Sequence, residues 1–212
     1  MSWLSNHTLN AMLTGMSALH RLRRCCENSD FCQDADCLNI LMQNQDTWGG
    51  VFAADKLPAP SSSENSCYIF NTASSSSKGE HWLAVRLLPN EVEFFDSYGQ
   101  LPWHYPPLYA WLQDVMKTSH RNRLLYYRQR IQGPHAYCGA YCFYFLCERP
   151  FAHSFYSTLF DNPRFVFSSL NAHTEDSALI QRYLSLNDSM VFDYLYRHTQ
   201  QLLSMFNEND DE

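Results

Sequence analysis

Two apolar stretches joined by a Pro-Asn turn constrain the fold more than any other part of this 212-residue sequence. The first, HWLAVRLL at 81–88, is apolar on both alternating faces, which is typical of a buried central strand. The second, EVEFFDS at 91–97, follows Pro89-Asn90 directly, so the two stretches are expected to pair as an antiparallel hairpin. The pattern therefore predicts a sheet with a buried middle.

Helices and further strands are expected around this hairpin. CYIFNT and RLLYYRQRI are strand candidates, whereas WGGVFAADKLP is expected to turn the chain. Apolar spacing and terminal residues predict helices over 7–24, 36–44, 106–117, 138–148, 176–186 and 189–206. The order predicts one α+β domain over 1–212, a small mixed or antiparallel central sheet packed by helices. Residues 1–35 are expected to be a helical extension, and 207–212 a disordered acidic tail.

Charge and apolar content indicate where the protein is located and which partners it does not attract. The net charge is −7, so no global basic field attracts nucleic acid or an anionic membrane. The start, MSWLSNHTLNAML, lacks the basic segment and long apolar core of a signal peptide, and no run reaches the length of a membrane span. These features predict an intracellular monomer that does not bind membranes.

The cysteine content admits two interpretations. Of the eight cysteines, four lie in HRLRRCCENSDFCQDADC, where His20 could join Cys25 or Cys26, Cys32 and Cys37 around zinc. However, no C-x2-C pair is present, and the spacing fits no common zinc module. Without a signal peptide a disulfide framework is not expected either, so we predict reduced cysteines and no bound metal.

The stretch IQGPHAYCGAYCFYF puts Cys138 at the expected start of a helix, behind a tight polar loop. Backbone N–H groups and the helix dipole favour a thiolate at that position, and the thiolate is the nucleophilic form of cysteine. Cys142 and Cys147 lie further along the same helix and are expected to be packing residues. Cys138 is therefore the candidate nucleophile.

Two residues of the hairpin could activate this thiol, one as its base and the other as the group that orients the base. His81 stands at the entrance of the first strand and Asp96 at the end of the second, so pairing across the turn brings them to the same edge. A histidine base needs a group that fixes its tautomer, and Asp96 could do so. Alone, each has an ordinary explanation as a surface or turn residue.

Three further residues complete the candidate site. Gln132 precedes Cys138 by six residues across a Gly-Pro turn, so its amide could donate toward the same point as the Cys138 N–H and form an oxyanion hole. Gly79 and Trp82, on either side of His81 in the sequence, are expected to line the substrate cleft.

The motifs GEHWLAV, FFDSYG and IQGPHAYCGAYCFYF together resemble the adenovirus-type cysteine proteases (adenain) and, more distantly, the Ulp/SENP proteases of ubiquitin-like proteins. WGGVFAADKLP followed by CYIFNTA is also similar to the adenain segment before the histidine, and the resemblance covers roughly 36–200. It implies the fold of those proteases, with His81 as general base, Asp96 as its orienter, Cys138 as nucleophile, and Gln132 with the Cys138 N–H as oxyanion hole.

The same resemblance implies a function. It indicates a cysteine endopeptidase that cleaves after glycine in capsid and core precursors of a DNA virus or virus-like element, in the host nucleus and the virion. Adenovirus enzymes are activated by DNA and by a viral peptide that is held through a disulfide. Here RNRLLYYRQR at 121–130 contains no cysteine, so a peptide activator is expected to bind non-covalently, and no cofactor is required for the chemistry.

Two other functions remain open. Adenovirus enzymes usually carry Glu at the orienter position, whereas Asp96 and the six-residue spacing from Gln132 to Cys138 are as in the Ulp/SENP group. That likeness makes a deubiquitinase or SUMO-type isopeptidase acting on host conjugates the alternative. A catalytically inactive interaction module is the third possibility, against which the intact set of four residues argues.

A basic stretch near the active-site loop could contact nucleic acid. Its cations alternate with Tyr126 and Tyr127, a mixture that can bind phosphates and stack on bases. A solvated strand with charged edges explains the same pattern and is favoured by the acidic charge of the whole chain. The cations are Lys117, Arg121, Arg123, Arg128 and Arg130.

Overall fold

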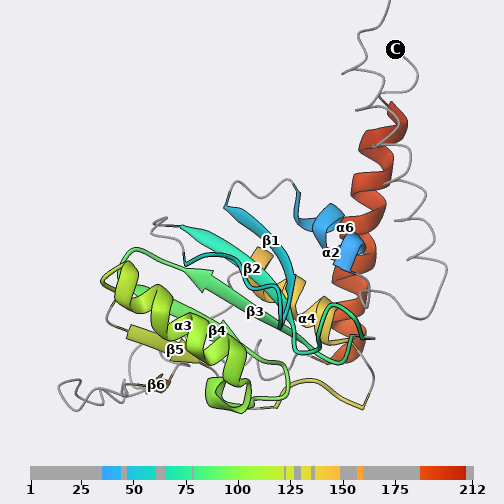
Figure 1. Ribbon diagram of the computed structural model, residues 1–212. Helices are drawn as coiled ribbons and strands as arrows, with labels where there is room; N and C mark the ends of the chain where they lie inside the picture. Colours follow the sequence, from blue (N-terminus) through green and yellow to red (C-terminus); the bar gives the residue numbers. More distant parts are fainter. Residues whose placement is uncertain are drawn as a thin grey trace, which may run out of the picture.

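A mixed sheet of six strands forms the centre of the protein in the computed structural model. The strands lie side by side in chain order (Figure 1), as β1 (Trp48–Ala53), β2 (Ser66–Asn71), β3 (Trp82–Leu87), β4 (Glu91–Phe95), β5 (Arg123–Tyr126) and β6 (Ser157–Leu159). The structure describes residues 35–43, 47–60, 65–77, 79–121, 123–126, 130–134, 137–148, 157–159 and 187–208.

The expected hairpin is present at the middle of this sheet. Strands β3 and β4 pair antiparallel, with Leu87 opposite Val92 and Ala84 opposite Phe95. Every residue of both strands is buried. Strands β2 and β3 also pair antiparallel, whereas β1–β2 and β4–β5 are parallel. The prediction of an α+β fold with a mixed central sheet is therefore confirmed.

The stretch that was expected to turn the chain begins as a strand, and the turn itself follows at residues 54–56. Residues Trp48–Ala53 form β1 and pair in parallel with β2. Gly49 and Gly50 suggested a turn, but they sit at a register irregularity between Trp48 and Gly50. Gly50 has φ of +123°, a conformation that glycine adopts without strain. The prediction was wrong for this first part because glycine at a bulge resembles glycine in a turn when only the sequence is considered.

Helices cover both faces of the sheet (Figure 1). Alternate side chains of β3 face opposite sides: Leu83 and Val85 pack with α3 (Pro106–Thr118), while Ala84 packs with α4 (Cys138–Glu148). The α4 side also includes α2 (Ala35–Met42) and α6 (Asp188–Glu208), and a short 3-10 helix, η1 (Pro102–His104), precedes α3. The predicted helices over 36–44, 106–117, 138–148 and 189–206 are confirmed within one or two residues at their ends, apart from those ends that lie outside the described residues.

A buried charge fixes α4 against the sheet. Arg86 of β3 donates from Nη2 to the carbonyl oxygens of Phe145 and Leu146, near the C-terminal end of α4. Its Nη1 forms a 2.8 Å ion pair with Glu93 of β4. A cation favours the negative end of a helix dipole, and the carboxylate compensates the buried charge. These bonds hold the helix that begins at Cys138 in a defined position against the hairpin.

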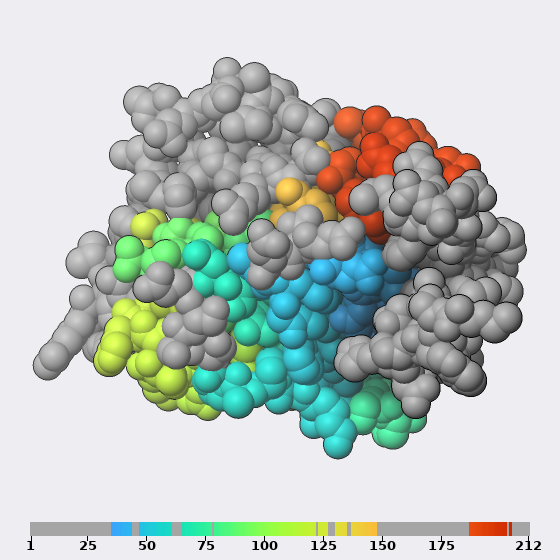
Figure 2. Space-filling model, turned by 90° about the horizontal axis from the view of Figure 1, so that it is seen from above, coloured from blue at the N-terminus to red at the C-terminus, as the bar shows by residue number. Residues whose placement is uncertain are grey.

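Helix α2 lies beside α6 in Figure 1, and the colours of Figure 2 place both on the same part of the surface. Both helices belong to the buried cluster that includes α4. Burial lowers the pKa of His198 in α6, and a hydrogen bond with the Leu41 backbone partly offsets this effect. Cys37 of α2 is disulfide-bonded, so the expectation that all cysteines are reduced is wrong at this position. Its partner is not among the described residues, because Cys67, Cys138, Cys142 and Cys147 form no disulfide.

Several expectations concern other parts of the chain. The helices over 7–24 and 176–186 lie outside the described residues, as does the extension before residue 35. Helix α6 continues through Glu208, so the first two residues of the expected acidic tail are helical and only its remainder lies outside the described residues. Among the helices of the described ranges, none combines the length and the apolar character required to cross a membrane.

Candidate active site

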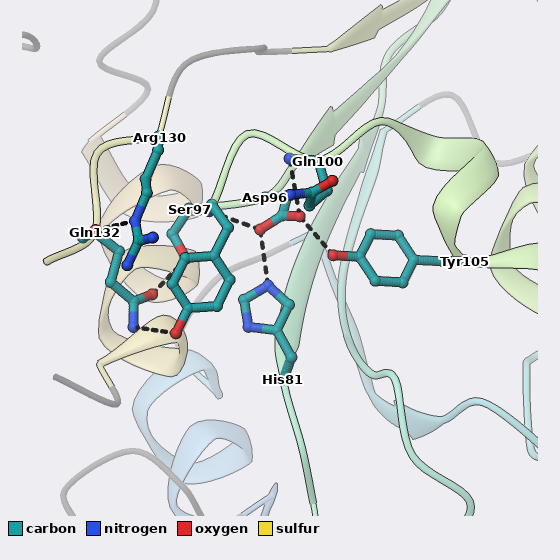
Figure 3. Close-up of polar contacts among 8 residues, drawn as sticks. His81, Asp96, Ser97, Gln100, Tyr105, Arg130 and Gln132 are labelled. Carbon is teal, nitrogen blue, oxygen red and sulfur yellow. Dashed lines mark hydrogen bonds and ion pairs between the residues drawn. The ribbon is translucent and has the colours of Figure 1, made fainter. Parts of the chain in front are cut away.

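His81 and Asp96 meet at the edge of the β3–β4 hairpin, as the pairing predicted. Nε2 of His81 lies 2.7 Å from Oδ1 of Asp96, and the Asp96 side chain is fully buried (Figure 3). His81 directly precedes β3 and Asp96 directly follows β4, so the antiparallel register itself brings the two side chains together. The bond leaves Nδ1 as the ring nitrogen available to another group.

The Asp96 carboxylate is held by four hydrogen bonds. Oδ1 accepts from the Tyr98 N–H at 2.8 Å in addition to His81. Oδ2 accepts from the Tyr105 hydroxyl at 2.6 Å and from the Gln100 N–H at 3.2 Å. Gly99, at φ of +68°, allows the tight turn that brings these N–H groups back onto the carboxylate. Both oxygens of the Asp96 carboxylate thus accept two hydrogen bonds each, and these bonds hold the carboxylate in a fixed orientation toward the imidazole.

Cys138 begins α4 and lies beside the free side of the His81 ring. Nδ1 of His81 is buried and meets no group at the geometry of a formed hydrogen bond, but the Cys138 thiol acts on the ring as a hydrogen-bond and charge partner. The thiol is therefore the neighbour of Nδ1, in the loose arrangement common to unliganded sites. Cys138 is only 6% exposed, so the sulfur is largely covered in this state.

The surroundings of His81 favour its charged form. Burial lowers the pKa of the ring, but the hydrogen bonds and charges of Asp96 and Cys138 raise it more, so the pKa rises from 6.5 to about 9. At neutral pH the ring therefore carries two protons. An imidazolium stabilises a thiolate next to it, and in such a pair the sulfur nucleophile and the proton donor are both ready.

Gln132 lies close to this group, with its amide held at both ends. Oε1 accepts from the Ser97 hydroxyl at 2.6 Å, and Nε2 donates to the Tyr98 hydroxyl at 3.2 Å. The side chain is 2% exposed. The sequence predicted an amide donor directed at the thiol; the structure places the Nε2 donor on Tyr98, whose ring stacks on His81.

Tyr98 is a site residue that sequence reasoning missed. Its ring stacks on the His81 ring with centroids 4.6 Å apart and 20° between the planes, and the Arg130 guanidinium lies 4.9 Å from the ring centre. Arg130 in turn donates from Nε to the Gln132 carbonyl at 2.9 Å. The residue was overlooked because Asp-Ser-Tyr-Gly is an ordinary turn sequence.

A carboxylate from α6 holds the loop after Gln132. Oδ1 of Asp188 accepts from the Gly133 N–H and from the Tyr141 hydroxyl, both at 2.9 Å. A Cβ at position 133 would lie 2.6 Å from the Asp188 carboxylate, which explains the glycine. Nothing in the local sequence links Asp188 to Gly133, 55 residues earlier, so this contact could not be found without the fold.

The two residues expected to line the cleft lie in different surroundings. Trp82 is 5% exposed and belongs to the same buried cluster as Cys138. Gly79 is exposed and packs against Asn71, whose amide nitrogen would lie 2.7 Å from a Cβ at that position. Asn71 accepts from the Glu80 N–H and thereby holds the segment that leads into His81.

A cavity of about 290 Å³ opens beside the site on the α3 face of the sheet. Its lining includes Glu80, the neighbour of His81, and Tyr105, the partner of Asp96. Phe70 and Leu83 contribute apolar surface. The remaining lining residues are Ala54, Leu57, Asn71, Thr72, His104, Pro106, Pro107 and Leu108.

The basic stretch considered for nucleic acid is engaged with protein groups. Arg121 is buried and donates from Nε to the Leu88 carbonyl. Arg123 forms a 3.2 Å ion pair with Glu91. Arg121 and Arg123 therefore both make contacts within the protein that support the sheet. The other members are Arg130, which contacts Gln132 and Tyr98, Lys117, which lies 3.5 Å from Asp114, and Arg128, which is outside the described residues.

The described ranges contain no cluster of three or more His, Cys, Asp or Glu side chains placed to hold an ion. Of the residues considered for zinc, only Cys37 falls within these ranges, and it is disulfide-bonded.

Comparison with known proteins finds no family model that matches the chain and no curated protein that matches its sequence. The site itself combines a cysteine at a helix start, an imidazolium aligned by a buried carboxylate, and an amide held at both ends.

Proposed function

We propose that the protein is a cysteine endopeptidase of the adenain/Ulp type that cleaves after glycine. One observation carries the proposal: the His81 ring is bound at Nε2 by buried Asp96, 2.7 Å away, and has Cys138 as the neighbour on its other side. A linear order of carboxylate, imidazole and thiol is one arrangement that activates a cysteine for acyl transfer. The chain order of His81, Asp96, Gln132 and Cys138 and the motifs around them add the resemblance to that group of proteases.

The reaction begins with the Cys138 sulfur. Its proton resides on Nδ1 of His81, and the sulfur attacks the carbonyl carbon of the glycine that precedes the cleaved bond. The carbonyl oxygen becomes an oxyanion, which the Nε2 donor of Gln132 and the Cys138 N–H can stabilise. Because the pKa of His81 is about 9, the ring keeps its proton at neutral pH until it transfers the proton to the leaving amine. A water molecule, deprotonated by the now neutral ring, then hydrolyses the thioester.

Restricted access to the sulfur supports glycine as the residue before the cleaved bond. Cys138 is 6% exposed and Tyr98 stacks on His81, so the approach to the thiol is narrow. A residue without a side chain can approach where bulkier residues cannot. By resemblance, the natural substrates are capsid and core precursors of a DNA virus or virus-like element, cleaved in the host nucleus or the virion.

A second candidate function shares the chemistry. Asp96 as orienter and the six-residue spacing from Gln132 to Cys138 agree with the Ulp/SENP group, which favours a SUMO-type or ubiquitin-type isopeptidase. Both substrate classes present a glycine carbonyl. A viral peptide or DNA could regulate either enzyme, and a peptide activator would bind non-covalently or through another cysteine, because residues 121–130 contain none.

The test uses a peptide vinyl sulfone that ends in glycine, with intact mass as the readout. We expect one adduct on wild-type protein and none on Cys138→Ala. Cys142→Ala is the matched control, because Cys142 lies one turn further along α4 and is fully buried. An unlabelled wild type that is folded would overturn the proposal. Cleavage of viral precursors compared with SUMO and ubiquitin fusions then identifies the substrate class.

A further inference from the structure

Ser97 is the residue of the Asp-Ser-Tyr-Gly turn that the chemistry above does not use. It directly follows Asp96 and is fully buried. A serine in an exposed turn needs no partner, whereas a buried hydroxyl must have one. The partner of Ser97 is the oxyanion donor itself, Gln132, which lies 35 residues away in the chain.

Ser97 contacts the Gln132 loop through both its backbone and its side chain. The Ser97 carbonyl accepts from the N–H groups of Ile131, at 3.0 Å, and Gln132, at 3.1 Å. The Ser97 hydroxyl donates to Oε1 of Gln132 at 2.6 Å. The backbone bonds fix where the loop lies. The hydroxyl contacts only the side chain of Gln132, so it can be removed without breaking the backbone hydrogen bonds that place the loop.

The orientation of the Gln132 amide matters because its two ends are chemically opposite. Nε2 can stabilise an oxyanion, and Oε1 in its place would repel one. The distances fit a single orientation: 2.6 Å to Ser97 suits an O–H···O bond, and 3.2 Å to Tyr98 suits an N–H···O bond. With Oε1 engaged by Ser97, Nε2 is the end that faces the ring stacked on His81.

We propose that Ser97 is a positioning residue for the oxyanion hole, whose hydroxyl determines which end of the Gln132 amide faces the substrate. The inference rests on the proposed cysteine protease function. In the free enzyme Nε2 donates to the Tyr98 hydroxyl, and the substrate oxygen replaces that hydroxyl when acylation begins. The bond from Ser97 to Oε1 persists throughout and holds the donor in its productive orientation.

The test is a double-mutant cycle of Ser97→Ala and Gln132→Ala, measured on a glycine-ending peptide substrate. We expect Ser97→Ala to lower kcat roughly 10-fold with little change in KM, as for loss of one hydrogen bond that orients a donor. Gln132→Ala lowers kcat by roughly 10²–10³. In the Gln132→Ala background, Ser97→Ala then has almost no further effect, because the two residues act as one unit.

Controls separate positioning from general damage. Ser119→Ala removes a hydrogen-bonded hydroxyl at the end of α3 and should leave kcat unchanged. Ser97→Thr keeps the hydroxyl and should retain most of the wild-type kcat. Alkylation of Cys138 by iodoacetamide forms no oxyanion, so its rate and pH profile should match wild type in Ser97→Ala. If Ser97→Ala does not fold, Ser97→Cys keeps the side-chain volume with a weaker donor and the same cycle applies.

The outcomes distinguish this inference from the function on which it rests. A wild type that neither cleaves the substrate nor reacts with the vinyl sulfone overturns both. An active wild type in which the two substitutions are additive overturns the role of Ser97 alone. A shifted pH profile of alkylation would also overturn it, because Ser97 would then act through its neighbour Asp96.

Discussion

Tyr105 donates a 2.6 Å hydrogen bond to Oδ2 of Asp96, while the His81 ring occupies Oδ1 of the same carboxylate. Burial raises the pKa of Tyr105 well above its usual range, with the charge of Asp96 adding to the effect, so the hydroxyl remains a donor at every pH of practical use. Asp96 is therefore held from both sides, and its alignment of His81 depends on a residue that precedes α3.

Tyr105→Phe should lower kcat by about fivefold to tenfold, because loss of one hydrogen bond lets the carboxylate turn away from the ring. The pKa of His81 should fall at the same time, which separates this effect from damage to the fold. Steady-state kinetics and NMR titration of the ring provide the two measurements. Tyr109→Phe, on the following turn of α3, is the control, and equal effects of the two substitutions would contradict the role of Tyr105.

Cys138→Ala should abolish cleavage of glycine-ending peptides, whereas Cys142→Ala should leave most of it. Only Cys138 stands at the start of α4 beside His81, and Cys142 is buried one turn later. The measurement is the amount of cleaved product, monitored by chromatography. A folded Cys138→Ala variant that still turns over would refute the assignment of the nucleophile.

Stability should depend on pH through His81. The folded pKa of about 9 exceeds the ordinary 6.5, so the charged ring stabilises the fold fully below pH 6.5 and loses this contribution as the pH rises through 9. The free energy of unfolding of wild type relative to His81→Phe should therefore shrink across that window, by at most about 1.4 kcal/mol per pH unit. Urea unfolding at pH 6, 7.5 and 9 measures the difference, and a constant value would contradict the prediction.

Asp188→Ala should lower kcat while Cys138 remains reactive toward iodoacetamide. The substitution leaves the Gly133 N–H without its partner at 2.9 Å and removes one of the two bonds of the Tyr141 hydroxyl. We expect a loss of about 1 kcal/mol in the free energy of unfolding, as for one hydrogen bond lost at a half-buried site. Asp193→Ala, on the exposed side of α6, is the control. Parallel loss of alkylation and turnover would indicate that the helix, and not the loop, had been disturbed.

Tyr98→Phe should raise kcat/KM about twofold to tenfold. The Tyr98 hydroxyl takes the Nε2 donor of Gln132 in the free enzyme, so substrate must first replace that hydrogen bond. Phenylalanine keeps the ring stacked on His81 and removes only the competing acceptor. Initial rates at low substrate concentration measure the change. A fall in kcat/KM would instead indicate that the hydroxyl helps to hold the productive amide.

The sequence by itself determined the parts of the site that depend on local order. Two strand-like stretches joined by Pro89-Asn90 predict the hairpin, and the hairpin brings His81 to Asp96 because antiparallel pairing sets the start of one strand beside the end of the next. The apolar run after the Gln-Gly-Pro loop likewise predicts a helix that begins at Cys138. Such patterns can be recognised in a sequence because the side chains of strands and helices repeat at short, fixed intervals.

Only the tertiary structure decided how these pieces support one another. Ser97 reaches Gln132 across 35 residues, and Arg86 reaches the α4 carbonyls across 59 and 60. No local pattern marks either contact, because a turn serine and a strand arginine are common in places where they have no such partner. Tyr98 lies on His81 only because Gly99 turns the chain back onto Asp96. Contacts of this kind depend on strand register and helix packing, which the whole chain sets together.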